Sequence, residues 1–190
     1  MKFDLVLANV GGQGGLSIAA VIAVAARHQG LNVKQSEVHG MSQRGGAVSA
    51  HLRISDQEVA SPLIPTGAAS MILSLEPMES IRYLSTLSSG GKIITAATPV
   101  INTSDYPPIA DLLATIRNIP GSVIVDAETL AREAGSFRTS NIVMLGAASR
   151  FLPLTPESLE KAIREIFISK GELIVSQNLK AFHLGREARA

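Results

Sequence analysis

Short apolar runs alternate with helical patterns along the first two thirds of the chain. Strands are expected at residues 3–8, 33–38, 47–54, 71–75, 92–97 and 122–126, and helices at 17–29, 78–87, 109–119 and 128–134. The run at 3–8 is almost entirely apolar, which is typical of a strand buried on both faces of a parallel sheet. The run at 47–54 alternates apolar and polar residues, which predicts a half-buried strand.

After residue 140 the pattern is purely helical. Three helices are expected. The first spans 141–151, the second begins at the start signal Thr155-Pro156, and the third spans 173–185. The pair Gly90-Gly91 is expected to form a turn before the strand at 92–97. Strands alternating with helices indicate a three-layer, Rossmann-like α/β domain with a mainly parallel sheet and C-terminal helices. We therefore predict a single domain over residues 1–190.

Composition narrows the class of protein. The chain has no cysteine, which excludes disulfides, a thiol nucleophile and iron–sulfur clusters held by its own thiolates. A formal net charge of +1 gives no electrostatic reason to expect nucleic acid or a membrane surface as a partner. Charged residues make up 17% of the chain, against about 25% in ordinary domains, so we expect extra buried surface and hence a subunit or an obligate oligomer.

No targeting segment is expected in this sequence. Asp4 interrupts the N-terminal apolar run, which does not fit a signal peptide. The longest apolar stretch, residues 18–26, is far short of the ~20 residues that a membrane span needs. We therefore expect a cytoplasmic protein.

The strongest local motif is a glycine loop, Gly11-Gly12-Gln13-Gly14-Gly15, between the first strand and the first helix. Its glycines let the backbone approach a ligand closely, and the following helix directs unpaired N–H groups toward the same place. Such a helix start attracts anions, phosphate above all. The alternative is a tight strand-to-helix turn in which the glycines serve only close packing.

A second loop follows the second strand and contains His39-Gly40, Arg44 and Gly45-Gly46. Polar, titratable and glycine residues are concentrated here, at a sheet edge where α/β proteins bind ligands. Arg44 could make a bidentate contact to a phosphate or carboxylate, and His39 is the one candidate for proton transfer. The alternatives are a solvated turn with Arg44 paired to Glu37, and a structural hydrogen bond for His39.

The glycine loop is also an imperfect dinucleotide fingerprint. It meets the first two glycines of G-x-G-x-x-G, but Ser17 stands at the last position, and Glu37 would be the acid that binds a ribose. No metal-ligand spacing and no G-x-S-x-G elbow occurs, so we expect neither a metal site nor a hydrolase triad. No catalytic residue is assigned. The acids Asp105, Asp111 and Asp126 are expected to cap elements or to face solvent.

The two loops together resemble the gamma-type domain of the 2-oxoacid:ferredoxin oxidoreductases, and within that family the small subunits of its indolepyruvate branch. The resemblance spans essentially the whole chain. The segments that carry it are 11–15, 37–46, 49–54, 61–65, 75–77, 141–146 and 177–185. One departure is Gly15, where relatives often have an aliphatic residue, and it is expected to loosen the turn.

This resemblance implies a subunit that is inactive alone. In the family a 2-oxo acid, here an aryl pyruvate, is decarboxylated on thiamine diphosphate, and its acyl group passes to coenzyme A. Electrons leave through iron–sulfur clusters to ferredoxin. The resemblance places the thiamine diphosphate, its magnesium and the clusters on a large partner subunit, and it places no cofactor on this chain. When isolated from that partner, the chain could form a homodimer. The glycine loop and Arg44 are then expected to face the partner's active site and hold a phosphate-bearing ligand such as coenzyme A.

Two other classes of function stay open. One is a free-standing regulatory module that binds NAD or FAD through the glycine loop and Glu37. The other is a purely structural subunit whose loops only bury surface against a partner.

Overall fold

The computed structural model describes residues 1–39 and 45–188. Within them, six strands form one sheet in the order β2-β3-β1-β4-β5-β6. The strands are β1 (Lys2–Val10), β2 (Asn32–His39), β3 (Ala47–Ser55), β4 (Ala69–Ser74), β5 (Leu87–Ala96) and β6 (Ser122–Val125). β1, β4, β5 and β6 pair in parallel, whereas β3 is antiparallel to both of its neighbours. The predicted mainly parallel α/β sheet is confirmed, with β3 as its reversed strand.

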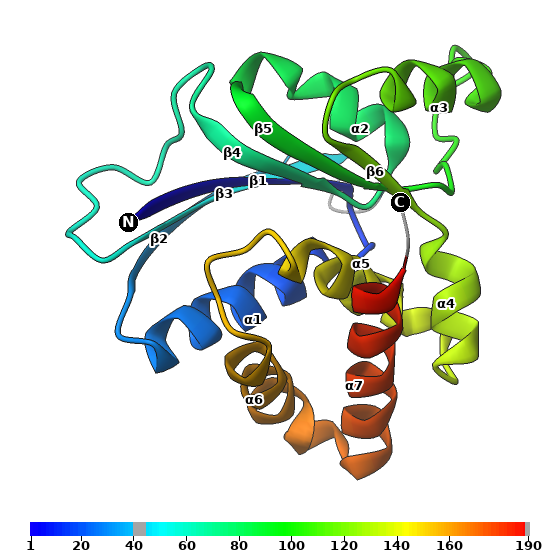
Figure 1. The fold of residues 1–190 in the computed structure, drawn as a ribbon. Helices are drawn as coiled ribbons and strands as arrows, with labels where there is room; N and C mark the ends of the chain where they lie inside the picture. Colours follow the sequence, from blue (N-terminus) through cyan, green and yellow to red (C-terminus); the bar gives the residue numbers. More distant parts are fainter. Residues whose placement is uncertain (40–44, 189–190) are drawn as a thin grey trace.

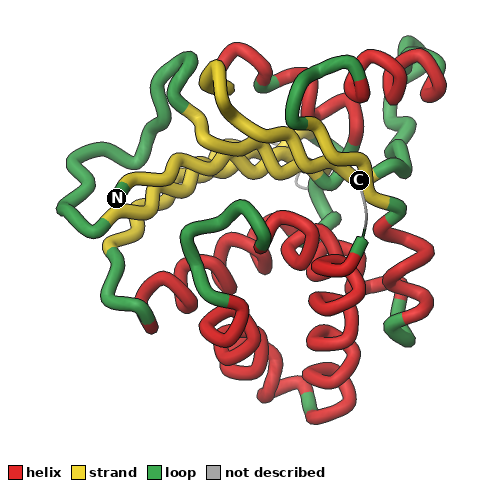
Figure 2. Tube along the Cα trace, viewed as in Figure 1, coloured by secondary structure: helices red, strands yellow, loops and turns green. Residues whose placement is uncertain are grey.

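Helices cover both faces of the sheet, which gives three layers (Figures 1 and 2). The α-helices are α1 (Gly15–His28), α2 (Pro77–Arg82), α3 (Ile109–Arg117), α4 (Ala127–Glu133), α5 (Ser140–Ser149), α6 (Pro156–Phe167) and α7 (Glu172–Glu187). In Figure 1, α2 and α3 lie on one face, and α1, α5, α6 and α7 lie on the other. Within the described residues, no helix has the length and apolar character needed to cross a membrane.

The larger hydrophobic core lies between the sheet and the layer that contains α1 and α5. It includes Leu5 and Leu7 of β1, Ile18 and Ile22 of α1, and Phe182 of α7, all of them at most 1% exposed. A smaller core on the other face of the sheet is centred on strand residues that alternate with these, such as Val6. β1 is therefore buried on both faces, as its unbroken apolar run predicts.

The strand β5 begins earlier than expected. Gly90 and Gly91 lie inside β5 rather than in a turn before it, and α2 ends at Arg82 with a short 3₁₀ helix, η1 (Leu84–Thr86), after it. The pairing of β4 with β5 shifts register between Ala69 and Met71, whose partners are Leu87 and Lys92, so the irregularity in β5 contains the glycine pair. A Cβ on Gly91 would lie 2.9 Å from the carbonyl oxygen of Ala69. The glycines thus serve close approach of two strands, not a chain reversal.

The half-buried character predicted for β3 is wrong for its polar face. Ala50, Leu52 and Ile54 face the larger core as expected. On the opposite face Ser49 is only 6% exposed, and residues 61–64 form hydrogen bonds with His51 and Arg53. The strand alternates because one side packs against apolar helices and the other against hydrogen-bonding backbone.

Two glycines set the packing of α5 against α7. A Cβ on Gly146 would lie 2.1 Å from the carbonyl oxygen of Phe182, and a Cβ on Gly185 would lie 1.9 Å from that of Val143. The helices approach so closely because neither glycine has a side chain. α5 is buried along its whole length, from Asn141 to Ser149, between the sheet and α7.

Candidate functional site

The glycine loop connects β1 to α1 at the carboxyl edge of the parallel strands. Gly12 and Gly14 have φ angles of +103° and +88°, a region that side chains with a Cβ rarely adopt. The amides of Gly11, Gln13 and Ser17 donate to backbone carbonyls. The amides of Gly12, Gly14, Gly15 and Leu16 have no hydrogen bond to another described residue, so the start of α1 presents donors suited to an anion.

The side chain of Gln13 holds this loop through two hydrogen bonds to the backbone. Its Oε1 accepts a hydrogen bond of 2.8 Å from the Val10 amide, and its Nε2 donates one of 2.9 Å to the Leu75 carbonyl. The side chain therefore joins the ends of β1 and β4. Among the predicted site residues, Gln13 has a positioning role.

Two asparagines that were not predicted from the sequence pack against the glycine loop. Asn141, at the start of α5, donates from Nδ2 to the Gly14 carbonyl at 3.1 Å, and its Oδ1 accepts from the Ile142 amide. Asn9 is 5% exposed, and its Oδ1 lies 2.1 Å from where a Cβ on Gly15 would stand. The expectation that Gly15 loosens the turn is therefore wrong, because the position is tightly packed. Asn141 lies in the family-like segment 141–146, which was the available signal.

The second loop lies against the glycine loop. The Gly11 amide donates to the Gly46 carbonyl at 2.8 Å, and the Gly45 amide donates to the Gly11 carbonyl at 3.2 Å. Asn102 also donates from Nδ2 to the Gly45 carbonyl at 2.6 Å. The structure thus brings Gly11, Gly45 and Gly46 together as predicted. Gly40 and Arg44 lie outside the described residues.

A cavity of about 440 Å³ lies where β2 ends beside the glycine loop. It is lined by the predicted residues Gly11, Gly12, Gly14, Gly15 and His39, together with Asn9, Leu16, Glu37 and Val48. His39 and Glu37 therefore share one cavity with four glycines of the loop.

A larger cavity of about 1220 Å³ lies on the other side of the glycine loop, over the ends of β4 and β5. Its wall includes Gly12, Gln13 and Gly14, the segment 98–100, and residues 135–141, which contain the 3₁₀ helix η2 (Phe137–Thr139). The charged side chains that line it are Arg132, Arg138, Lys170 and Glu128. The excess of cations favours an anionic ligand.

Glu76, which follows β4 in the family-like segment 75–77, is structural. It is 1% exposed, caps α2 by accepting the Glu79 amide at 2.9 Å, and accepts a hydrogen bond from the Tyr106 hydroxyl. Burial and the Glu76 carboxylate raise the pKa of Tyr106, which keeps that hydroxyl protonated as a donor. This contact ties residues 97–108 to the edge of the sheet, where Asn102 reaches Gly45.

The remaining titratable residues fit structural roles. Asp126 caps α4 by accepting the Thr129 amide at 3.1 Å, and Asp111 lies in the first turn of α3. His28 lies 3.0 Å from Glu165 of α6. In the described part of the chain, no three histidine, aspartate or glutamate side chains are grouped so that they could hold a metal ion.

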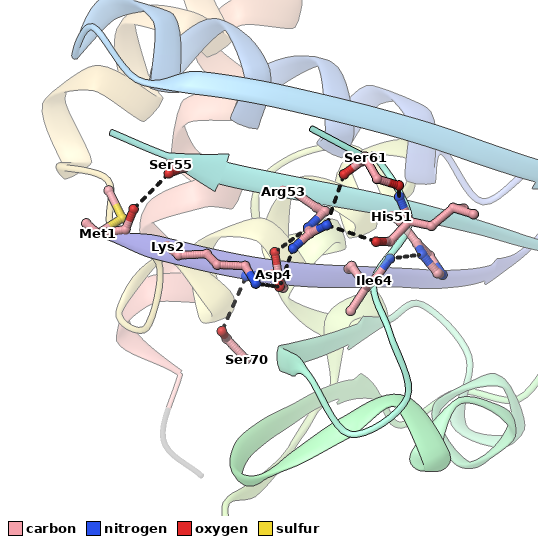
Figure 3. Close-up of polar contacts among 10 residues, drawn as sticks. Met1, Lys2, Asp4, His51, Arg53, Ser55, Ser61, Ile64 and Ser70 are labelled. Carbon is pink, nitrogen blue, oxygen red and sulfur yellow. Dashed lines mark hydrogen bonds and ion pairs between the residues drawn. The ribbon is translucent and has the colours of Figure 1, made fainter. Parts of the chain in front are cut away.

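The family-like segment 49–54 forms a buried polar clamp on the far face of the sheet (Figure 3). Asp4 is 2% exposed and pairs with Arg53, whose Nε lies 2.9 Å from Oδ1. The Arg53 guanidinium also donates to the carbonyls of Ser61 and Leu63, both at 3.0 Å. Beside it, the Ile64 amide donates to Nδ1 of His51 at 3.0 Å. These contacts hold residues 56–68 over β3 and β1.

His51 should make stability depend on pH. Burial, and then the nearby Arg53 guanidinium, lower the pKa of His51 below its ordinary 6.5, against a smaller opposing effect of Asp4. The folded chain then binds fewer protons than the unfolded chain as the pH falls, so this contribution is complete above pH 6.5 and is lost as pH falls through the folded pKa. We expect the free energy of unfolding in urea to fall between pH 7.5 and 5.5, and to fall less in His51→Gln, which keeps an acceptor that does not titrate. An equal fall in both proteins would contradict this role.

The chain is similar to proteins of one oxidoreductase family. The model of the pyruvate ferredoxin/flavodoxin oxidoreductase family matches residues 4–188. Indolepyruvate oxidoreductase subunit IorB of Archaeoglobus fulgidus is 39% identical, covering 97% of this chain and 94% of that protein. The corresponding IorB subunit of Thermococcus kodakarensis is 36% identical over 98% and 96%.

Two solved structures have the same fold. The gamma subunit of a keto/oxoacid ferredoxin oxidoreductase from Geobacter sulfurreducens has a TM-score of 0.71 at 27% identity, covering 97% of this chain and 94% of that one. The 2-oxoglutarate:ferredoxin oxidoreductase of Magnetococcus marinus, with 2-oxoglutarate, coenzyme A and succinyl-CoA bound, has a TM-score of 0.77 at 21% identity. This chain corresponds to 30% of that longer chain.

Proposed function

The chain belongs to the pyruvate ferredoxin/flavodoxin oxidoreductase family, and on that premise we propose which reaction it serves and what it contributes. It is a small subunit of a 2-oxoacid:ferredoxin oxidoreductase. Its complex oxidises indolepyruvate and related aryl pyruvates: the 2-oxo acid loses CO₂, its acyl group is transferred to the thiol of coenzyme A, and two electrons pass to ferredoxin. The names of the relatives at 36–39% identity support this substrate class.

The redox cofactors of this reaction do not fit the chain. Its sequence has no cysteine to hold an iron–sulfur cluster, and among its described residues no three histidine, aspartate or glutamate side chains are grouped so that they could hold a metal ion. We therefore assign those cofactors to a large partner subunit, which supplies decarboxylation and electron transfer. The chain itself, as a single domain over 1–190, is expected to be inactive alone, and we place the complex in the cytoplasm.

The proposed contribution of this chain is to hold the phosphate-bearing part of coenzyme A. The observation that carries it concerns the glycine loop: Gly12 and Gly14, whose amides have no hydrogen bond to another described residue, line a cavity of about 1220 Å³ with an excess of cationic side chains. That volume exceeds the roughly 300–1,000 Å³ typical of sites for compact ligands, so it fits an extended one. Gly11 contacts Gly45 and Gly46, and Arg44, the residue before them, would add a guanidinium for phosphate.

Replacing Arg44 by alanine in the assembled complex should raise the KM for coenzyme A about tenfold or more with a smaller change in kcat, because a charge-assisted hydrogen bond contributes about 1.5–3 kcal/mol. Arg117→Ala, at the end of α3 on the opposite face of the sheet, is the matched control and should change neither constant. Unchanged kinetics in Arg44→Ala would remove the proposed contact. Lost assembly with the large subunit would instead indicate a purely structural role.

One observation favours a second function, a free-standing module that binds NAD or FAD. Glu37 and four glycines of the loop line the smaller cavity together, which is the arrangement a ribose and a pyrophosphate would need. The last glycine of the fingerprint is Ser17, which speaks against it. Titration of the isolated chain with NADH and with FAD distinguishes the two, since stoichiometric micromolar binding would favour the module.

A further inference from the structure

An exposed aromatic side chain stands on the wall of the larger cavity. Phe137 is 66% exposed, although the protein has only five phenylalanines, two tyrosines and no tryptophan. It lines the same cavity as Gly12 and Gly14 of the glycine loop. Because burying an aromatic ring is favourable, a ligand in this cavity that covered Phe137 would be bound more tightly.

The backbone beneath Phe137 is firmly held. Ser136 caps η2 by accepting the Arg138 amide at 3.3 Å, and the Thr139 hydroxyl donates to the Ser136 carbonyl at 2.8 Å. Gln177 of α7 donates from Nε2 to the Gly135 carbonyl at 3.1 Å. The exposed ring is therefore mounted on a turn that is anchored to α7, which limits the entropy lost when a ligand stacks on it.

A cation accompanies the ring. The guanidinium carbon of Arg138 lies 5.8 Å from the centroid of the Phe137 ring, and Arg138 also lines the cavity. A flat apolar face beside a guanidinium suits a planar heterocycle that carries a phosphate: the ring stacks and the cation contacts the anion. A bare phosphate would use only the cation, and an aliphatic chain would gain little from a planar ring.

The position of Phe137 also fits the far end of an extended ligand. Asn141, which contacts Gly14, lies four residues further along the chain. The ring and the glycine loop both line the larger cavity, so a ligand of several linked groups can contact both.

We propose that Phe137 and Arg138 form a stacking platform for the adenine ring of coenzyme A. This inference rests on the proposed function, in which coenzyme A is the phosphate-bearing ligand of the site. Stacking on Phe137 would place the adenine end of the ligand beside η2, while the amides of the glycine loop hold phosphate nearer α1. Phe137 then selects for the nucleotide part of the ligand and takes no part in the chemistry.

The test is equilibrium binding by calorimetry to the assembled complex, with coenzyme A and with 4′-phosphopantetheine, which lacks the adenosine part. Phe137→Ala should weaken binding of coenzyme A about tenfold, within the range seen when base stacking on an aromatic residue is removed. Binding of 4′-phosphopantetheine should stay unchanged, and Phe137→Trp should retain the affinity for coenzyme A. Leu173→Ala is the matched control, because the Leu173 side chain is 71% exposed and lines neither cavity. This variant should leave both affinities unchanged.

The other outcomes each overturn the platform. If Phe137→Ala changes the affinity for neither ligand, or for both equally, the Phe137 ring does not bind the adenine ring. If the variant loses the large subunit, Phe137 is a contact between subunits instead. Should Arg44→Ala weaken both ligands while Phe137→Ala weakens neither, the platform fails and the proposed function stands. If the unaltered complex binds no coenzyme A, both fail together.

Discussion

Replacing Gly185 by alanine should prevent the chain from reaching its stable native packing. The new Cβ would stand 1.9 Å from the carbonyl oxygen of Val143, and a backbone atom of a buried helix cannot move aside as a flexible side chain does. α5 and α7 would have to separate along their whole contact, so we expect a loss of unfolding free energy above the roughly 1–3 kcal/mol of ordinary overpacking. Thermal unfolding and soluble yield measure the effect.

Gly90→Ala is the control for Gly185→Ala. Gly90 lies in β5 without a positive φ, and a Cβ there meets nothing within 4 Å. This variant should stay within about 0.5 kcal/mol of the unaltered protein, as an unhindered surface substitution does. Gly146→Ala should behave like Gly185→Ala, because its Cβ would meet the Phe182 carbonyl at 2.1 Å. A Gly185→Ala protein with unchanged Tm would show that the helices do not need their close approach.

The second large effect is expected from Asp4→Ala. This change leaves the Arg53 guanidinium, whose side chain is only 12% exposed, without its carboxylate. Removing one member of a buried pair typically costs about 3–5 kcal/mol, because the remaining charge stays desolvated. Two carbonyls that accept from Arg53 retain part of its solvation, so we expect the lower part of that range. Urea denaturation of the purified chain gives the difference directly.

Lys2→Ala is the matched control, because Lys2 contacts the same carboxylate at 3.2 Å but has a side chain 58% exposed. Its loss should cost no more than about 1 kcal/mol. The double variant Asp4→Ala/Arg53→Leu removes both charges of the pair, so neither is left buried without its partner. Its destabilisation should therefore be smaller than the sum of those of Asp4→Ala and Arg53→Leu. Additive losses would mean that the ion pair contributes nothing as a pair.

Much of the fold follows from local patterns in the sequence. Apolar runs such as 3–8 and the helix signal at Thr155-Pro156 placed strands and helices within a few residues of their observed ends, because burial and capping are properties of short segments. The antiparallel direction of β3 could also have been predicted from the sequence. Only residues 40–46 separate β3 from β2, and a crossover between parallel strands needs a dozen or more residues.

Other features depend on segments far apart in the sequence. The cover over β3 comes from carbonyls of residues 61–63, which carry no pattern that predicts a partner. The glycine pair at 90–91 predicts a turn by itself, and only the neighbouring β4 makes it a strand bulge.

The candidate site was predicted in its loops but not in their supports. The glycine loop, His39, Gly45 and Gly46 are close together as expected, because strand ends at one sheet edge converge. Asn9 and Asn141 were missed, since an asparagine that packs against a glycine has the same local signature as one that faces water. Gln13, predicted among the ligand-binding residues, also positions the loop, because its side chain forms hydrogen bonds with backbone groups at the ends of β1 and β4.

The contact between Asn141 and Gly14 has a consequence for biosynthesis, since its two residues are 127 positions apart. At about 5–20 residues per second, a ribosome needs roughly 6–25 s to make the intervening polypeptide. The nascent glycine loop therefore lacks this contact until α5 has been made, although Gln13 can already hold the loop to the end of β1. Because α5 packs against α7, a chain that stops before α7 is expected to lose the support of α5 and with it the contact between Asn141 and the glycine loop.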